Sequence, residues 1–101
     1  MSTTRIELAS EVAEDFERIL DHLEQYQAAQ LGERIREIIS AIDVLARNPC
    51  IGRPAAGGRR ELLIGRGTHG YVALYRYVAE IDTVFVLAVR SQREAGFSRE
   101  A

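Results

Sequence analysis

The side chains best suited to chemistry are arginines in the second half of the chain. Arg76 lies within an aliphatic and aromatic stretch, whereas Arg90 and Arg93 lie at and just beyond the end of the next one. Guanidinium groups bind carboxylates and phosphates through paired hydrogen bonds. An arginine among apolar neighbours either forms a salt bridge inside the fold or joins a basic patch for a partner's carboxylates or a nucleic-acid phosphate. Both interpretations of Arg76 and Arg90 stay open from the residue types alone.

A glycine-rich loop, residues 65–70, carries Arg66 and His69 as further candidates. Its N–H donors resemble those of phosphate-binding loops, but the residue order matches no phosphate-loop or dinucleotide motif. A surface loop with positive-φ glycines is the simplest interpretation, with His69 as an acid–base or hydrogen-bonding group as the alternative. The tyrosines, Tyr75 among them, are more typical of packing residues than of a base-stacking platform.

Several kinds of chemistry are excluded by composition. The chain has 13 basic residues and none is lysine, which removes Schiff-base chemistry and the lysine of a phosphate-binding loop. No Ser-His-Asp arrangement with a nucleophile elbow is present. Cys50, His22 and His69 are too few and wrongly spaced for a structural zinc. We therefore expect neither a metal nor a cofactor.

Charge and hydropathy limit the partners. The net charge of −2 over 101 residues argues against direct DNA binding by the bulk of the surface. No apolar run approaches the roughly 20 residues needed to cross a bilayer. A single cysteine and no apolar leader favour a reduced, cytoplasmic protein. The charge is uneven, however: residues 1–46 carry a net −6 and residues 47–101 a net +4. This division predicts different faces or partners for the two halves.

The acidic half has helical periodicity. Apolar residues recur at i, i+4, i+7, i+8 and i+11 from Val12, with Ser10 placed to cap the helix and Glu14 placed to pair with Arg18. A second apolar stripe runs from Leu31 to Leu45 and includes Ile39, and Asn48-Pro49 ends it. We expect an antiparallel helical hairpin that turns near residues 25–31, and whose apolar stripes need a partner surface.

The basic half has strand patterns. Strands are expected at residues 4–8, 60–64, 71–78 and 83–90, and the link at 79–82 is short enough for a hairpin. Within 71–78, alternation places Tyr71, Ala73, Tyr75 and Tyr77 on one face, with Arg76 on the other. The predicted fold class is α+β: an N-terminal strand, an antiparallel helical hairpin, then a three-stranded antiparallel meander. We expect residues 1–101 to form a single domain.

Six short pieces in a fixed order carry a family resemblance. They are LARNP at 45–49, IGRP at 51–54, RELL at 60–63, GYVALYRY at 70–77, VFVLAVR at 84–90 and QRE at 92–94. In this order the chain resembles the RelE/ParE superfamily of toxins from type II toxin–antitoxin systems, over nearly its whole length. The α+β fold that the resemblance implies agrees with the strand and helix patterns.

The superfamily offers two activities. RelE-like members are ribosome-dependent endoribonucleases that cut mRNA without metal, using lysines, arginines and a carboxy-terminal tyrosine, whereas ParE-like members inhibit DNA gyrase by binding it. This chain departs from the RelE pattern in having no lysine, in Val72 where an arginine would follow the Gly-Tyr pair, and in Phe97 at the late aromatic position. Losing one oxyanion-type donor already costs on the order of 10²–10³ in rate. The resemblance therefore favours the ParE-like branch, a binding toxin rather than an enzyme.

The resemblance also implies partners and contact residues. A ParE-like toxin is expected to arrest growth by binding DNA gyrase and to be neutralised by a cognate antitoxin, with most contacts on the basic half. Candidate binding residues are Arg66, His69, Tyr75, Arg76, Arg90, Arg93 and Phe97. The alternative is a RelE-like endoribonuclease with Arg90, Arg93 and His69 as catalytic groups. A third possibility is an inactive member that only binds its antitoxin.

Overall fold

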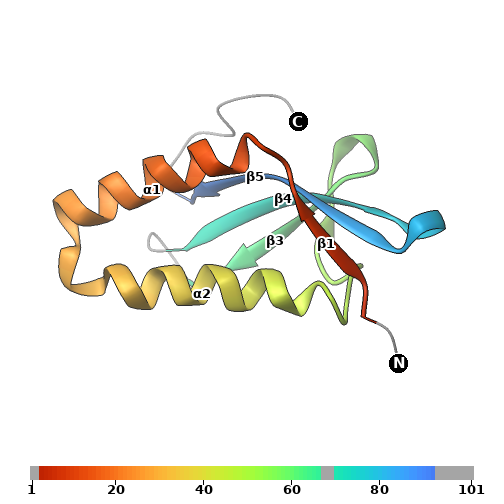
Figure 1. Cartoon of the computed structure of the whole chain (residues 1–101), viewed down its shortest axis with the longest axis horizontal. Helices are drawn as coiled ribbons and strands as arrows, with labels where there is room; N and C mark the ends of the chain where they lie inside the picture. Colours follow the sequence, from red (N-terminus) through yellow and green to blue (C-terminus); the bar gives the residue numbers. More distant parts are fainter. Residues whose placement is uncertain (1–2, 67–69, 93–101) are drawn as a thin grey trace.

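The computed structural model of the chain describes residues 3–66 and 70–92, which form a five-stranded sheet with two helices on one face (Figure 1). The sheet order is β1-β5-β4-β3-β2. The α+β class, the helical hairpin and the antiparallel meander are confirmed. The elements in chain order are β1 (Arg5–Leu8), α1 (Val12–Tyr26), η1 (Ala28–Gln30), α2 (Leu31–Val44), β2 (Arg53–Pro54), η2 (Ala56–Gly58), β3 (Arg60–Ile64), β4 (Tyr71–Val78), η4 (Ala79–Ile81) and β5 (Thr83–Ser91).

The sheet is mixed rather than purely antiparallel. Strands β3, β4 and β5 form the expected meander, and β1 adds to β5 in parallel with Arg5 opposite Thr83 and Leu8 opposite Val86. The connection between β1 and β5 runs through the helical hairpin and strands β2 to β4, and it is long enough for the crossover that a parallel pair requires. The two-residue strand β2 pairs with the start of β3 and was absent from the sequence prediction, because two residues carry no alternation to detect.

Helix α1 begins without the expected side-chain cap. The Ser10 hydroxyl donates to the Glu11 carboxylate, while the N–H groups of the first turn donate to backbone carbonyls, including that of Ala9. The predicted pairing of Glu14 with Arg18 is also wrong. Arg18 pairs with Asp15 instead, three residues away. Asp15 and Arg18 both contact the backbone of β5 at Val89.

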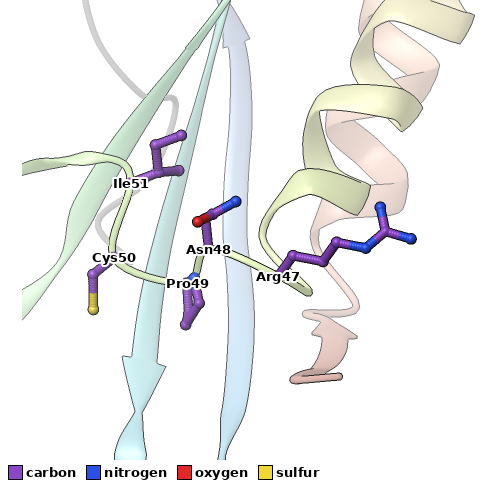
Figure 2. Close-up of a pocket in the computed structure, with 5 residues that line it drawn as sticks. All are labelled: Arg47, Asn48, Pro49, Cys50 and Ile51. Atoms are coloured by element: carbon purple, nitrogen blue, oxygen red, sulfur yellow. The ribbon is translucent and has the colours of Figure 1, made fainter. Parts of the chain in front are cut away.

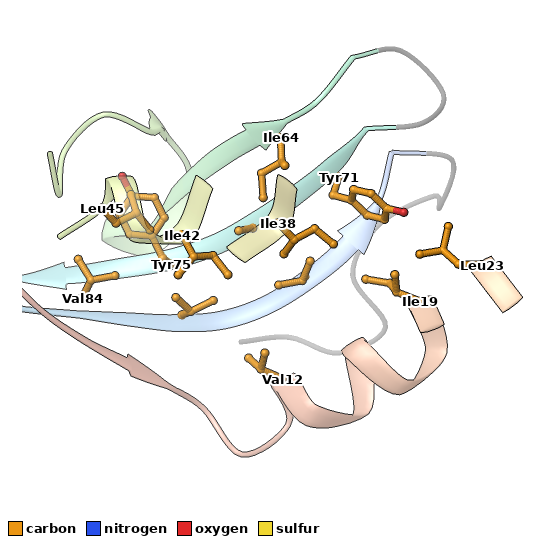
Figure 3. Packing of buried hydrophobic residues seen from close by; sticks show 13 residues of the cluster. Val12, Ile19, Leu23, Ile38, Ile42, Leu45, Ile64, Tyr71, Tyr75 and Val84 are labelled. Carbon is orange, nitrogen blue, oxygen red and sulfur yellow. The ribbon is translucent and has the colours of Figure 1, made fainter. Parts of the chain in front are cut away.

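The core lies between the sheet and the helical hairpin (Figure 3). The predicted faces of β4 are confirmed, since Tyr71, Ala73 and Tyr75 all belong to the core cluster. Helix α2 contributes Ile38 and Ile42, but Ile39, from the predicted apolar stripe, is exposed. The remaining buried members of the cluster are Val12, Ile19, Leu23, Leu45, Ile64, Val84, Val86 and Val89.

A β-bulge decides which side chains of β5 face the helices. Leu74 lies opposite Ala88 and Tyr75 lies opposite Val86, so the register shifts by one residue between these pairs. A bulge reverses the alternation that follows it. Val86 and Val89 therefore both belong to the core cluster, and Arg90 lies on the opposite side of the sheet.

Candidate functional site

The face of the sheet turned away from α1 and α2, which we call the far face, carries the candidate arginines. Alternation along β4 places Val72, Leu74 and Arg76 there, because their neighbours fill the core. The strand registers add side chains from the flanking strands to the same face. They include Arg5 and Glu7 from β1, Glu61 and Leu63 from β3, and Phe85, Ala88 and Arg90 from β5.

Arg76 is an exposed cation of the far face. It lies opposite Phe85 on β5, near the end of the sheet that carries the β4–β5 turn. A salt bridge from Arg76 to the helical hairpin, one of the two interpretations left open, is wrong, because the helices cover the other face. Within residues 3–66 and 70–92, no ion pair involves Arg76.

Arg90 lies on the same face but at a different place. It is half-buried, lies opposite Val72, and donates from Nη1 to the Ser91 carbonyl at 3.1 Å. Val72 and Arg76 are four residues apart on β4, which corresponds to about 13 Å of strand. The fold therefore separates Arg76 and Arg90 into two positions rather than one cluster.

Arg66 is exposed and follows β3, next to Gly65, whose φ of +73° is in the left-handed region that favours glycine. His69, Arg93 and Phe97 lie outside the described residues. Of the candidate contact residues, the described part of the chain thus places Arg66, Arg76 and Arg90 at or near the surface.

Tyr75 is a core residue. Its side chain is 0% exposed, and its hydroxyl accepts a hydrogen bond from the buried Gly52 N–H at 2.8 Å (Figure 3). Burial raises the pKa of the Tyr75 phenol, and the Gly52 hydrogen bond opposes this shift only in part. The phenol ties the link before β2 to the centre of the sheet. In this structure Tyr75 supports the fold and offers no surface to a partner.

A buried polar cluster joins α1 to β5. Asp15 is 1% exposed; its Oδ2 accepts from the Val89 N–H at 3.0 Å, and its Oδ1 accepts from Arg18 Nη1 at 3.1 Å. Arg18 Nη2 in turn donates to the Val89 carbonyl at 3.3 Å. The pairing of β1 with β5 ends at Val86. Beyond it, Asp15 and Arg18 form hydrogen bonds with the N–H and carbonyl of Val89, as the backbone of a neighbouring strand would. The sequence analysis missed Asp15, because an acid in the first turn of a helix is ordinarily solvated.

A second polar cluster closes the β4–β5 turn. Asp82 has a φ of +46°, and its Oδ1 accepts from the Thr4 and Tyr77 hydroxyls, each at 2.8 Å. The hydrogen bonds from Tyr77 and then Thr4 lower the pKa of the Asp82 carboxyl. The same bond to Asp82 raises the pKa of the Tyr77 phenol. The turn is thereby tied to the chain just before β1.

One surface hollow borders the far face. It encloses about 420 Å³ beside β1 and the start of β5, and Phe85 lies in its lining. Leu8 and Ile81, 52% and 60% exposed, make it largely apolar, while Arg5 and Glu7 form an ion pair in the lining. Exposed aliphatic side chains around a hollow are typical of contact surfaces for other proteins.

A second hollow, of about 390 Å³, lies at the link between α2 and β2 (Figure 2). Cys50 is exposed there, and Figure 2 shows its thiol pointing away from the guanidinium of Arg47. Arg47 is not placed to form an ion pair with a Cys50 thiolate.

The described residues contain no group of three His, Cys, Asp or Glu side chains close enough to hold a metal ion. Over the same residues, no helix combines the length and apolarity that crossing a membrane requires.

Comparison with protein families matches residues 6–96 to the ParE toxin of the type II toxin–antitoxin system parDE. The chain belongs to the ParE toxin family. No curated protein matches it. Among solved structures, it is similar to the chromosomal ParDE toxin–antitoxin system from P. aeruginosa, with a TM-score of 0.73 at 19% identity, covering 88% of this chain and 96% of that one. It is also similar to the toxin–antitoxin complex RelBE2 from Mycobacterium tuberculosis, with a TM-score of 0.58 at 22% identity, covering 89% of this chain and 99% of that one.

Family membership confirms the RelE/ParE resemblance and its ParE-like branch. At these identities the two solved structures support the fold, a ParE-like sheet with a helical hairpin, and not the individual contact residues.

Proposed function

We propose that this ParE-family toxin arrests growth by binding DNA gyrase in the cytoplasm, and that a cognate antitoxin neutralises it by binding the basic half of the chain. The observation that carries the proposal is the family match over residues 6–96. The solved ParDE and RelBE2 systems, which share the fold, are toxin–antitoxin assemblies, and this supports an antitoxin partner.

The far face favours binding over RNA cleavage. Val72, where the nuclease pattern has an arginine, is 1% exposed and can present nothing to a substrate. The chain has no lysine to replace that arginine. Of the three groups in the nuclease alternative, the described residues include only Arg90, and its Nη1 donates to the Ser91 carbonyl. Phosphoryl chemistry without metal needs several donors placed together.

Antitoxin binding has a physical basis in the exposed cations. Arg66 and Arg76 are exposed, and the second half of the chain carries a net +4. Arginine forms bidentate hydrogen bonds with carboxylates, so an acidic antitoxin segment complements this surface. A complex that contacts only the acidic faces of α1 and α2 would contradict this part of the proposal.

The gyrase proposal is tested by the supercoiling of relaxed plasmid with purified gyrase, ATP and increasing amounts of the full chain. We expect supercoiling to fall at micromolar protein and to recover when antitoxin is added. Unchanged supercoiling at those concentrations would refute gyrase as the target.

A translation extract treated with the same protein serves as the parallel test. Codon-specific mRNA cuts that disappear in Arg93→Ala would show the RelE-like endoribonuclease instead. Absence of both effects, together with normal growth on expression, would identify an inactive member that only binds its antitoxin.

A further inference from the structure

Strand β1 lies at one edge of the sheet. Its inner side pairs with β5, and within residues 3–66 and 70–92 no strand pairs with its outer side. The strand at the opposite edge, β2, is two residues long and contains Pro54, which has no N–H to donate. Proline and lysine commonly protect an edge strand from pairing with another chain, and β1 contains neither. The outer side of β1 is therefore suited to pairing with a further strand.

The backbone bonds of β1 show which of its residues face outward. The N–H groups of Arg5 and Ala9 donate inward, to carbonyls of the β4–β5 turn and of β5. Backbone groups alternate in direction along a strand, so those of Glu7 also face β5, while those of Ile6 and Leu8 face outward. A strand added to this edge must therefore form its hydrogen bonds with Ile6 and Leu8.

The charges of β1 are self-complementary. Arg5 and Glu7 are two residues apart on the far face, form an ion pair with each other, and have side chains that are 74% and 40% exposed. If β1 pairs antiparallel with β1 of a second copy about Ile6, Arg5 of each copy lies opposite Glu7 of the other. Opposite charges at such positions stabilise a strand pair, and like charges destabilise it.

Other registers lose this complementarity. A shift by two residues in one direction places Arg5 opposite Arg5, and a shift by two in the other direction places Glu7 opposite Glu7. A shift by one residue brings inward-facing backbone groups opposite outward-facing ones, and it also exchanges the faces of the side chains. The register centred on Ile6 thus satisfies both the backbone and the charges.

We propose that a second copy of this chain binds along β1, antiparallel and centred on Ile6, so that the two sheets continue into one. The two Ile6 residues exchange N–H and carbonyl hydrogen bonds. The pairs of Arg5 with Glu7 flank them at non-hydrogen-bonded positions, where opposite side chains approach most closely. Further out, the Leu8 N–H of each copy lies opposite the Thr4 carbonyl of the other, while the Thr4 N–H remains bonded to the segment after α2.

The apolar hollow beside β1 borders this interface. Leu8 and Ile81, 52% and 60% exposed, line it together with Phe85. In the proposed register Arg5 of the second copy lies opposite Glu7, whose partner on the inner side is Phe85. The methylene stem of an arginine covers apolar surface while its guanidinium keeps a charged partner. A four-residue strand buries less than the roughly 1,200–2,000 Å² of a standard interface, so we expect a weak dimer.

A strand of a different protein is the other possible occupant of this edge. The second copy is favoured because its own β1 carries both charges at the required spacing and in the required direction. The interface lies at the β1 edge, away from the exposed Arg66 and Arg76 proposed to meet the antitoxin. The inference therefore does not depend on gyrase as the target, and the supercoiling result has no bearing on it.

The association is measured by sedimentation velocity of the full chain between about 10 µM and 1 mM. We expect the sedimentation coefficient to increase with concentration, from that of a monomer toward that of a dimer. Amide hydrogen exchange followed by NMR over the same range locates the contact. The Ile6 amide should exchange more slowly as concentration rises, whereas the Arg5 amide, which already donates to the Asp82 carbonyl, should change little.

Charge-reversal variants test the register. Arg5→Glu and Glu7→Arg each place like charges opposite one another, so each variant alone should dimerise at least about tenfold more weakly than the native chain. An equimolar mixture of the two should dimerise again, because each variant complements the other, and so should the double variant Arg5→Glu/Glu7→Arg. The matched control, Arg36→Glu at an exposed position of α2, makes the same change in net charge and should dimerise like the native chain.

A chain that stays monomeric up to about 1 mM would overturn the inference. So would native dimerisation in both single variants, or a mixture of the two that does not associate, since the contact would then lie elsewhere. Melting temperatures check that each variant folds. Slower exchange of the Ile6 amide only when antitoxin is added would assign the edge to an antitoxin strand instead of a second copy.

Discussion

Replacing Asp15 by alanine should be among the most destabilising single changes outside the apolar core. The carboxylate is 1% exposed and accepts two hydrogen bonds, from the Val89 N–H at 3.0 Å and from Arg18 Nη1 at 3.1 Å. Asp15→Ala leaves the Val89 N–H without its carboxylate partner. It also removes the ion pair with Arg18, whose side chain is 38% exposed and also donates to the Val89 carbonyl.

The expected loss of stability is large for a chain of this size. Losing the hydrogen bond from the buried Val89 N–H to a carboxylate costs about 1.5–3 kcal/mol, and losing an ion pair to a solvent-accessible arginine adds about 0.2–1 kcal/mol, so the total is about 2–4 kcal/mol. Small domains have a total free energy of unfolding of about 5–15 kcal/mol, so a substantial part of the stability is lost. Each kcal/mol corresponds to about 4–8 °C in the melting temperature of a domain this long, so a decrease on the order of 10–25 °C is expected. Asp15→Asn keeps one acceptor oxygen and should lose less.

Urea denaturation followed by circular dichroism measures the effect. The matched control is Glu14→Ala, the exposed neighbour on the same helical turn, which should change the free energy of unfolding by no more than about 0.5 kcal/mol. If Asp15→Ala and Glu14→Ala unfold within about 1 kcal/mol of each other, the buried cluster does not anchor α1 to β5.

The remaining predictions concern the core phenol and the β4–β5 turn. Tyr75→Phe leaves the buried Gly52 N–H without its acceptor and should cost about 1–3 kcal/mol in urea denaturation, whereas an unchanged midpoint would show that water replaces the phenol. Gly52→Ala would place a Cβ 2.7 Å from the Tyr75 ring and 2.8 Å from the Glu61 carbonyl, so the melting temperature should fall; a melting temperature equal to that of the native chain would contradict the close packing. In the folded chain the pKa of the Asp82 carboxyl is lowered by hydrogen bonds from the hydroxyl of Tyr77 and then that of Thr4. The contribution of Asp82 to the free energy of unfolding is therefore present above the pKa of this carboxyl in the unfolded chain, and it disappears as the pH falls through the lower pKa of the folded chain. Melting temperatures between about pH 2 and pH 5 should therefore fall more steeply in the native chain than in Asp82→Asn, and parallel profiles would exclude this role.

Periodicity predicted most of the fold because the core here obeys it. The bounds of β3 and β4 follow directly from alternation, and buried Ile38 and Ile42 follow the helical repeat of α2. The parallel pairing of β1 with β5 was not predicted, since Arg5–Leu8 is too short to specify a neighbour. Strand order depends on which surfaces the hairpin leaves uncovered, and no local pattern contains this information.

The candidate site was less predictable than the fold. The types of Arg66, Arg76 and Arg90 identified cations that the fold places at or near the surface, but Tyr75 was assigned to the contact surface and lies in the core.

The buried Asp15 was also missed. Its partner on β5 is 74 residues away in sequence, so no spacing within α1 distinguishes it from the solvated acids around it.

The central claim, that this ParE-family toxin acts on gyrase by contact, is tested most directly by gyrase-dependent DNA cleavage. Plasmid incubated with purified gyrase and the full chain is treated with detergent and protease, and the linear DNA that gyrase has trapped is quantified. The proposal predicts linear DNA that increases with the amount of toxin, requires gyrase, and disappears when antitoxin is added first. Linear DNA at the background level over the whole toxin range, together with unaltered supercoiling, would contradict it.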